Sequence, residues 1–220
     1  MKLYCKILLI TFITFTTVNS CNSQPVKDRE IHQLWLDCRL ENIIPYKIFS
    51  SAIMGSRQIN NLKKKNLITI IDYSKPSTEN RFFVIDLIKK QLLYKCLVAH
   101  GKNSGDYSAT QFSNQPESLK SSLGFFITAE TYVGIHGFAL KLDGLEKGIN
   151  DNAREREIVI HGAFYVSREF IKKYGRLGRS WGCPALPLAF SKEIINMISG
   201  GSCLFIYAVD DYYKKNSKFI

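Results

Sequence analysis

Alternation between apolar and polar side chains dominates the chain from about residue 67 onward. The apolar positions there follow a period of two and are rich in Ile, Val, Phe and Tyr, a pattern typical of half-buried β-strands. Turn residues such as Lys75-Pro76-Ser77 separate these segments. The sequence therefore predicts a mostly β domain, a β-rich α+β fold built on a mixed sheet or sandwich. Strands are expected at residues 67–73, 81–87, 91–99, 124–132, 138–142, 158–161 and 203–209.

Helical spacing of apolar residues is concentrated near the start of the chain. It predicts helices within 28–40 and 48–62, and shorter helices are expected at 167–173 and 191–199. The last of these ends at a Gly-Gly pair, which is typical of a helix C-terminus. We therefore expect a signal segment at 1–20, a leader with short helices at 21–65, a main domain at 66–210 and a C-terminal tail at 211–220.

The first twenty residues have the pattern of an export signal. Lys2 and Lys6 precede a mostly apolar run, which is too short to span a bilayer because spanning needs about 20 apolar residues. Ser20 followed by Cys21 resembles a bacterial lipoprotein cleavage site. We expect Cys21 to become a lipidated N-terminus that anchors an exported protein in the cell envelope or periplasm. Plain cleavage nearby and an uncleaved anchor are the alternatives.

The charge of the chain favours an anionic partner. The formal net charge is +11, and removing the signal with its two lysines and no acid leaves +9. A basic surface suits nucleic acid, membrane or wall polymer. No helix-turn-helix, RNA-binding or zinc pattern is present, so we expect no nucleic-acid partner. A solvated lysine-rich surface explains the charge equally well.

Cys183 stands apart from the other cysteines by its neighbours. Of six cysteines, Cys5 leaves with the signal, and the four beyond Cys21 match neither a disulfide framework nor a zinc site. Cys96 and Cys203 lie within strand-like runs, where core packing explains them. Cys183 instead lies among Gly, Ser, Arg and Pro, which favours an accessible thiol over a buried small hydrophobe.

A histidine at a predicted strand end provides a base for this thiol. If the fold brings His161 to Cys183, the imidazole can take the thiol proton and leave a nucleophilic thiolate. Gly182 lets the backbone turn sharply and direct N–H groups at a developing oxyanion. His100 and His136 also follow strand-like runs, so on position alone either is an alternative base.

The order His161-Gly162, then Ser-x-Gly-Cys at residues 180–183, resembles the signature of bacterial L,D-transpeptidases of the YkuD type. The form of residues 178–186 resembles the murein L,D-transpeptidase branch. The chain departs from the commoner motif at Trp181, where His is usual, and at Ala185, where Arg is frequent. The similarity runs from about 67 to 207 and includes residues 74–77, 99–105, 142–146 and 148–154.

The resemblance implies acyl transfer on peptidoglycan stem peptides without a metal or organic cofactor. Cys183 would attack the carbonyl of the third residue of a tetrapeptide and expel D-alanine, and an amine of a neighbouring stem would resolve the thioester into a 3→3 cross-link. Alignment with the motif selects His161 as base and then acid. The oxyanion would face the N–H groups of Gly182 and Cys183, and Ser180 would orient the imidazole.

Substrate contacts are expected on both sides of this pair. Arg179 adjoins the nucleophile turn and suits a donor carboxylate or electrostatic support of the thiolate, a solvated surface arginine being the alternative. Trp181 would form an aromatic wall, and His136 would line the pocket. The polar loop with Asn152 and Arg154 would line a groove for a peptide carboxylate, a simple turn being the alternative.

Other activities fit the same residues less completely. An L,D-carboxypeptidase differs only in using water as acceptor. A papain-like wall amidase has its Cys before its His, and a sortase needs an Arg downstream of its Cys, where this chain has none. A non-catalytic wall-binding lipoprotein would leave the Ser-Trp-Gly-Cys turn unexplained. The sequence does not indicate an oligomeric state.

Overall fold

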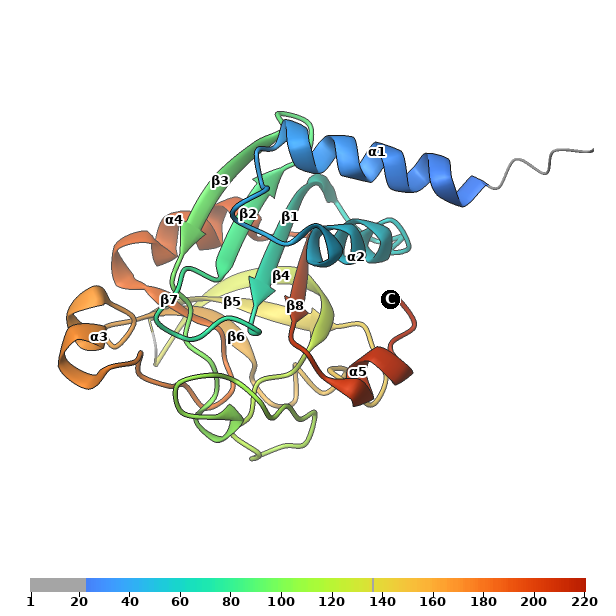
Figure 1. Ribbon diagram of the computed structural model, residues 1–220. Coiled ribbons are helices and arrows are strands. Elements are labelled where there is room, and N and C mark those ends of the chain that lie inside the picture. Colours follow the sequence, from blue (N-terminus) through green and yellow to red (C-terminus); the bar gives the residue numbers. More distant parts are fainter. Residues whose placement is uncertain (1–22, 136) are drawn as a thin grey trace, which may run out of the picture.

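One mixed sheet organises the computed structural model, which describes residues 23–135 and 137–220 (Figure 1). Within these ranges eight strands follow the order β3-β2-β1-β8-β4-β5-β6-β7. The β1–β8 and β6–β7 pairs are parallel and the other pairs are antiparallel. The prediction of a mostly β fold with a mixed sheet is confirmed. The strands are β1 (Lys64–Asp72), β2 (Phe82–Asp86), β3 (Gln91–Cys96), β4 (Gly124–Gly134), β5 (Gly137–Gly144), β6 (Val159–Ala163), β7 (Ala185–Pro187) and β8 (Ser202–Tyr207).

Short helices surround this sheet. The predicted helix at 48–62 is wrong in its bounds, because α2 begins at Tyr46 and ends at Ser56. The C-terminal tail carries a helix that the sequence pattern did not predict, α5. The described helices are α1 (Ser23–Asp37), α2 (Tyr46–Ser56), the 3₁₀ turn η1 (Lys102–Ser104), α3 (Arg168–Tyr174), α4 (Leu188–Ile198) and α5 (Asp211–Asn216).

The helices α1 and α2 share the core of the sheet. Ile31 of α1 and Phe49 of α2 are buried in the same apolar cluster as Phe125 and Phe205 of the sheet. Gly55 lets α2 approach β4 closely, since a Cβ there would lie 2.1 Å from the Phe125 ring. Burial of this apolar surface is the main force that holds the segment against the sheet.

A buried polar pair joins β4, β5 and the C-terminal helix. The Asn150 amide donates to the Leu123 and Phe125 carbonyls at 2.8 and 3.1 Å, and its oxygen accepts from the Glu146 N–H at 2.8 Å. The Glu146 carboxyl accepts from the Phe125 N–H and from the Tyr213 hydroxyl of α5. Burial raises the pKa of Glu146. The pair thus fixes the end of the chain beside the sheet.

We expect Asn150→Ala to lower the free energy of unfolding by about 3 kcal/mol, because a buried group left without its partner costs about 1–3 kcal/mol and the Glu146 N–H loses its acceptor. Urea unfolding measures this change. The matched control is Asn216→Ala, which removes an exposed amide and should stay within about 0.5 kcal/mol of the wild type. Equal losses in both variants would contradict the assigned role of Asn150.

Candidate active site

Parallel pairing of β6 with β7 brings His161 and Cys183 to one edge of the sheet. His161 lies opposite Ala185, two residues beyond Cys183. The Val159 N–H donates to the Cys183 sulfur at 3.4 Å, and the thiol donates to the Glu157 carbonyl at 3.5 Å. His161 therefore lies on β6 and Cys183 lies in the turn just before the neighbouring strand β7, with its thiol facing the start of β6.

His161 has a defined hydrogen bond within this site. The side chain is 3% exposed, and its Nδ1 lies 3.0 Å from the Gly162 carbonyl oxygen. Because a carbonyl only accepts, this contact places a proton on Nδ1, and in the neutral form of the ring the lone pair is then on Nε2. An imidazole in this tautomer can take a proton at Nε2.

The surroundings of the Cys183 thiol disfavour its charged form. Burial raises its pKa, and the Val159 N–H and the positive charge of Arg156 oppose that rise. The residue is only half-buried, whereas Cys38, Cys96 and Cys203 are buried, and all four are free thiols. A protonated thiol needs a base before it can attack a carbonyl.

The turn before Cys183 is closed by Ser180. Its hydroxyl accepts from the Gly182 N–H at 3.1 Å and donates to the Cys183 carbonyl at 2.6 Å. Gly182 has φ of +128°, and a Cβ there would lie 2.9 Å from the Lys120 carbonyl oxygen. This shape therefore requires glycine. The role of Ser180 in orienting His161 stays a prediction, as does the use of the Gly182 N–H as an oxyanion donor.

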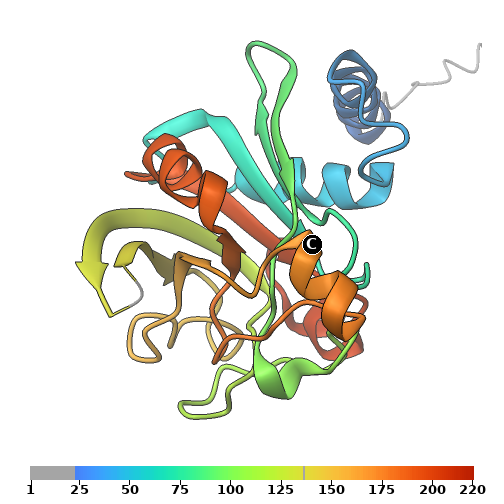
Figure 2. The same cartoon turned by 90° about the vertical axis from the view of Figure 1, so that its left-hand side faces the viewer.

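Segment 97–122 supports the nucleophile turn from the side (Figure 2). The His100 carbonyl accepts from the Ser180 N–H at 3.0 Å, and the Ser180 carbonyl accepts from the Lys102 N–H at 2.7 Å. Past the cysteine, the Ala99 N–H donates to the Ala185 carbonyl at 2.9 Å. The turn is thus held at both ends by the same neighbouring segment.

A fully buried arginine holds that segment in turn. The Arg81 guanidinium donates to the Val98 and Lys75 carbonyls and to the His100 Nδ1 at 2.7 Å. Burial and the charge of Arg81 lower the pKa of His100 to about 4, so the ring is neutral and donates from Nε2 to the Gly105 carbonyl. His100 therefore has a structural role. Sequence reasoning missed Arg81, whose only signal is a charge at the start of an apolar strand.

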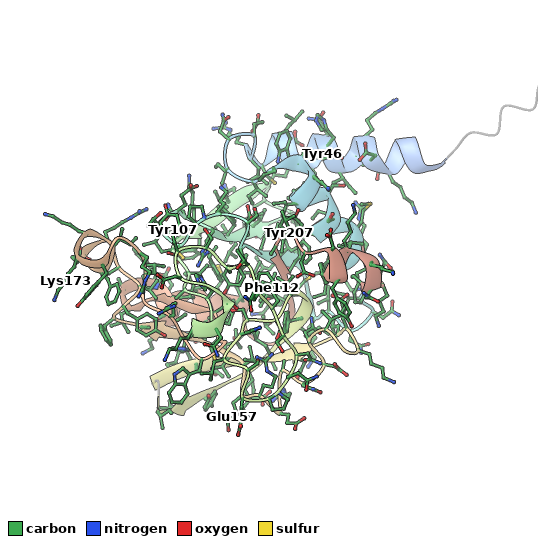
Figure 3. All side chains as sticks on the ribbon, turned by 60° about the horizontal axis from the view of Figure 1, so that its bottom comes forward. Tyr46, Tyr107, Phe112, Glu157, Lys173 and Tyr207 are labelled. Atoms are coloured by element: carbon green, nitrogen blue, oxygen red, sulfur yellow. The ribbon has the colours of Figure 1, made fainter. Side chains whose placement is uncertain are left out.

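A groove of about 470 Å³ lies between the β4–β5 hairpin and the start of β6. Glu157 and Val159, which both contact the Cys183 sulfur, belong to its lining, and Glu157 projects at the surface (Figure 3). Arg154 also lines the groove, and its charge is paired with Glu130 and Asp143, so its role in binding a peptide carboxylate stays a prediction. The remaining lining residues are Tyr132, Gly134, Ile135, Lys141, Ala153 and Ile158.

The other residues predicted to contact substrate differ in their exposure and in their hydrogen-bond partners. Trp181, two residues before Cys183, is 74% exposed. Arg179 is held by Asp106 at 3.0 Å and by loop carbonyls. Asn152 bonds to the backbone and side chain of Asn114, which is a structural contact. His136 lies outside the described residues, as do Cys21 and the signal segment.

Neither a metal cluster nor a spanning helix occurs in the described part of the chain. Across 23–135 and 137–220, no three His, Cys, Asp or Glu side chains gather closely enough to hold a metal ion. In the same ranges no helix is both long and apolar enough to cross a membrane.

Two of three comparisons with known proteins found matches. A family model described as an L,D-transpeptidase catalytic domain matches residues 40–207. Among solved structures, an L,D-transpeptidase from Mycobacterium smegmatis is 15% identical with a TM-score of 0.40, over 65% of this chain and 59% of that one. The helical cell shape determining protein from Campylobacter jejuni is 14% identical with a TM-score of 0.45, over 73% and 57%. No curated protein matches. This chain spans about three-fifths of the length of those solved structures.

We expect Cys183 to react with iodoacetamide faster than Cys38, Cys96 or Cys203 in the native protein. Burial raises the pKa of these three thiols to between about 11 and about 12 and also keeps the reagent out. Peptide mapping after brief alkylation measures each site. In guanidinium chloride all four should react at similar rates, and equally fast native labelling of Cys203 would contradict the site geometry.

Proposed function

Because this chain belongs to the L,D-transpeptidase catalytic domain family, we propose that it is a cysteine-dependent peptidoglycan L,D-transpeptidase that forms 3→3 cross-links. The observation that carries the proposal is the position of Cys183. Its sulfur accepts a hydrogen bond from the backbone of β6, and Cys183 lies two residues before Ala185, which pairs with His161. A half-buried thiol with an imidazole on the adjacent strand suits covalent acyl transfer. The groove beside Glu157 supplies space for a peptide.

In the first half of the proposed reaction, His161 Nε2 takes the Cys183 proton and the sulfur attacks the carbonyl carbon of the third stem residue. The bond from that carbon to the nitrogen of D-alanine breaks, and the imidazolium returns the proton to the leaving amine. The product is a thioester on Cys183. Backbone N–H groups of the nucleophile turn would stabilise the oxyanion that forms on the way.

In the second half, the amine of a neighbouring stem attacks the thioester. His161 takes a proton from that amine, the carbon–sulfur bond breaks, and the thiolate regains a proton. With water in place of the amine the same steps give an L,D-carboxypeptidase. Mass analysis of products from a defined tetrapeptide muropeptide distinguishes a cross-linked dimer from a tripeptide.

We expect Cys183→Ala to abolish both products, because alanine supplies no nucleophile. His161→Gln should lower the rate by about 100- to 10,000-fold, the usual contribution of a general base. The double variant should be little worse than either single one, since both residues act in one step. His32→Gln, on the exposed side of α1, is the control. Intact-mass detection of a carbapenem adduct reports acylation directly. An adduct on the Cys183→Ala variant would contradict the assignment of Cys183 as the nucleophile.

We also propose that the protein is an exported lipoprotein anchored through Cys21. The support is sequence evidence alone: Lys2, Lys6, a short apolar run and Ser20 before the cysteine. Such an anchor would place the enzyme beside its polymeric substrate in the cell envelope.

We expect Cys21→Ser to move the protein from the membrane fraction to the soluble fraction and to change its electrophoretic mobility, because no lipid can be attached. Fractionation followed by immunoblotting measures both. Cys5→Ser, within the signal, is the control and should leave the distribution unchanged. If Cys21→Ser protein stays in the membrane fraction, the lipoprotein proposal is wrong.

A further inference from the structure

Arg156 is a half-buried cation beside the nucleophile turn that sequence reasoning passed over. Its Nη atoms donate to the carbonyls of Ser113 and Lys120 at 2.7 and 2.6 Å, and to the hydroxyls of Ser118 and Ser122. All four acceptors are neutral oxygens. Within the described residues no carboxylate forms an ion pair with Arg156.

The other arginines near the site differ in this respect. Arg154 is paired with Glu130 and Asp143, and Arg179 with Asp106. Their positive charges are therefore largely cancelled at short range. Arg156 keeps its charge without such compensation, although burial lowers its pKa, because a guanidinium stays protonated at neutral pH.

The guanidinium of Arg156 lies close to the turn that carries Cys183. Its Nη2 lies 3.4 Å from the point where a Gly182 Cβ would stand, so the guanidinium packs against the turn. The loop that Arg156 binds contacts the same turn, since the Ser121 hydroxyl donates to the Gly182 carbonyl at 3.2 Å. Arg156 thus connects segment 113–122 to the residue before Cys183.

We propose that Arg156 is a positioning residue that supplies the positive charge stabilising the Cys183 thiolate and clamps segment 113–122 onto the nucleophile turn. The inference rests on the proposed role of Cys183 as nucleophile. It predicts that the thiolate forms at lower pH than the burial of this thiol alone would allow. The charge acts through space, since the Nη groups donate to loop oxygens.

The other titratable groups that interact with the thiol include Glu157, Tyr73 and Tyr165. Glu157 raises the pKa of Cys183, opposite to Arg156. Burial raises the pKa of Tyr73 and of Tyr165 to about 12, so both phenols are neutral in the working range. His161 is the proton acceptor of the proposed reaction. A pH profile of the thiol therefore reports mainly on Arg156, Glu157 and His161.

The test is the rate of iodoacetamide alkylation of Cys183 against pH. In Arg156→Gln the apparent pKa of the thiol should rise by about one unit, the lower end of the effect of a nearby charge, so at neutral pH alkylation slows about tenfold and recovers at higher pH. Arg156→Lys keeps a charge but loses the forked hydrogen bonds, and its profile should stay closer to the wild type. Arg168→Gln, a charge loss far from the thiol on α3, is the matched control.

An unchanged profile in Arg156→Gln, or equal rises in Arg156→Gln and Arg156→Lys, would overturn the inference in favour of a purely structural clamp. If Arg156→Gln does not fold, Arg156→Met replaces it as the uncharged variant, with circular dichroism as the check. The assay contains no peptidoglycan. A shifted profile in a protein that makes no cross-links would therefore refute the proposed function without touching this inference.

Discussion

The buried guanidinium of Arg81 is the constraint on which the candidate site depends. An ion removed from water costs several kcal/mol unless its donors are paired, and Arg81 meets this demand with two backbone carbonyls and the His100 ring, while its plane lies 4.8 Å over Tyr73. Two of these partners, Val98 and His100, belong to the segment after β3 and are available only when that segment is in place. That segment in turn bonds both ends of the nucleophile turn. Assembly of the core and assembly of the site are thereby linked.

Two arginines serve this site in different ways. Arg81 is fully buried and makes hydrogen bonds that set the backbone around His100. Arg156 is half-buried and faces the turn itself, with a charge that the surrounding neutral oxygens solvate without cancelling. A thiol in a poorly hydrated position needs such compensation, because desolvation disfavours its charged form. In the proposed mechanism, burial would shield the thioester on Cys183, and the charge of Arg156 would offset the cost that burial imposes on the thiolate.

Both ends of the described chain pack onto the sheet or onto the loops beside it. The helices α1 and α2 contribute to the core that β1 and β8 share, and the family match begins at residue 40, within the segment expected to be a leader. At the other end Tyr213 and Ser217 bond to Glu146, and Phe219 packs on Phe125. The sheet that carries His161 is therefore braced by both ends of the described chain.

The local sequence pattern was enough to locate most of the strands and the candidate nucleophile. Runs of apolar β-formers bounded by turn residues located seven strands, of which β1, β2 and β8 are buried along most of their length on both faces. The small polar neighbours of Cys183 marked it as a candidate nucleophile. The three-residue strand β7 is too short to show a period. The short helix α5 is tied to the rest of the chain by the hydrogen bond from Tyr213 to Glu146. Arg81 binding His100, Arg156 binding Lys120, and Val159 bonding the Cys183 sulfur join residues 19 to 36 positions apart. Only tertiary packing decided these contacts, since charge and hydrogen-bond partners across such separations leave no periodic trace in the sequence.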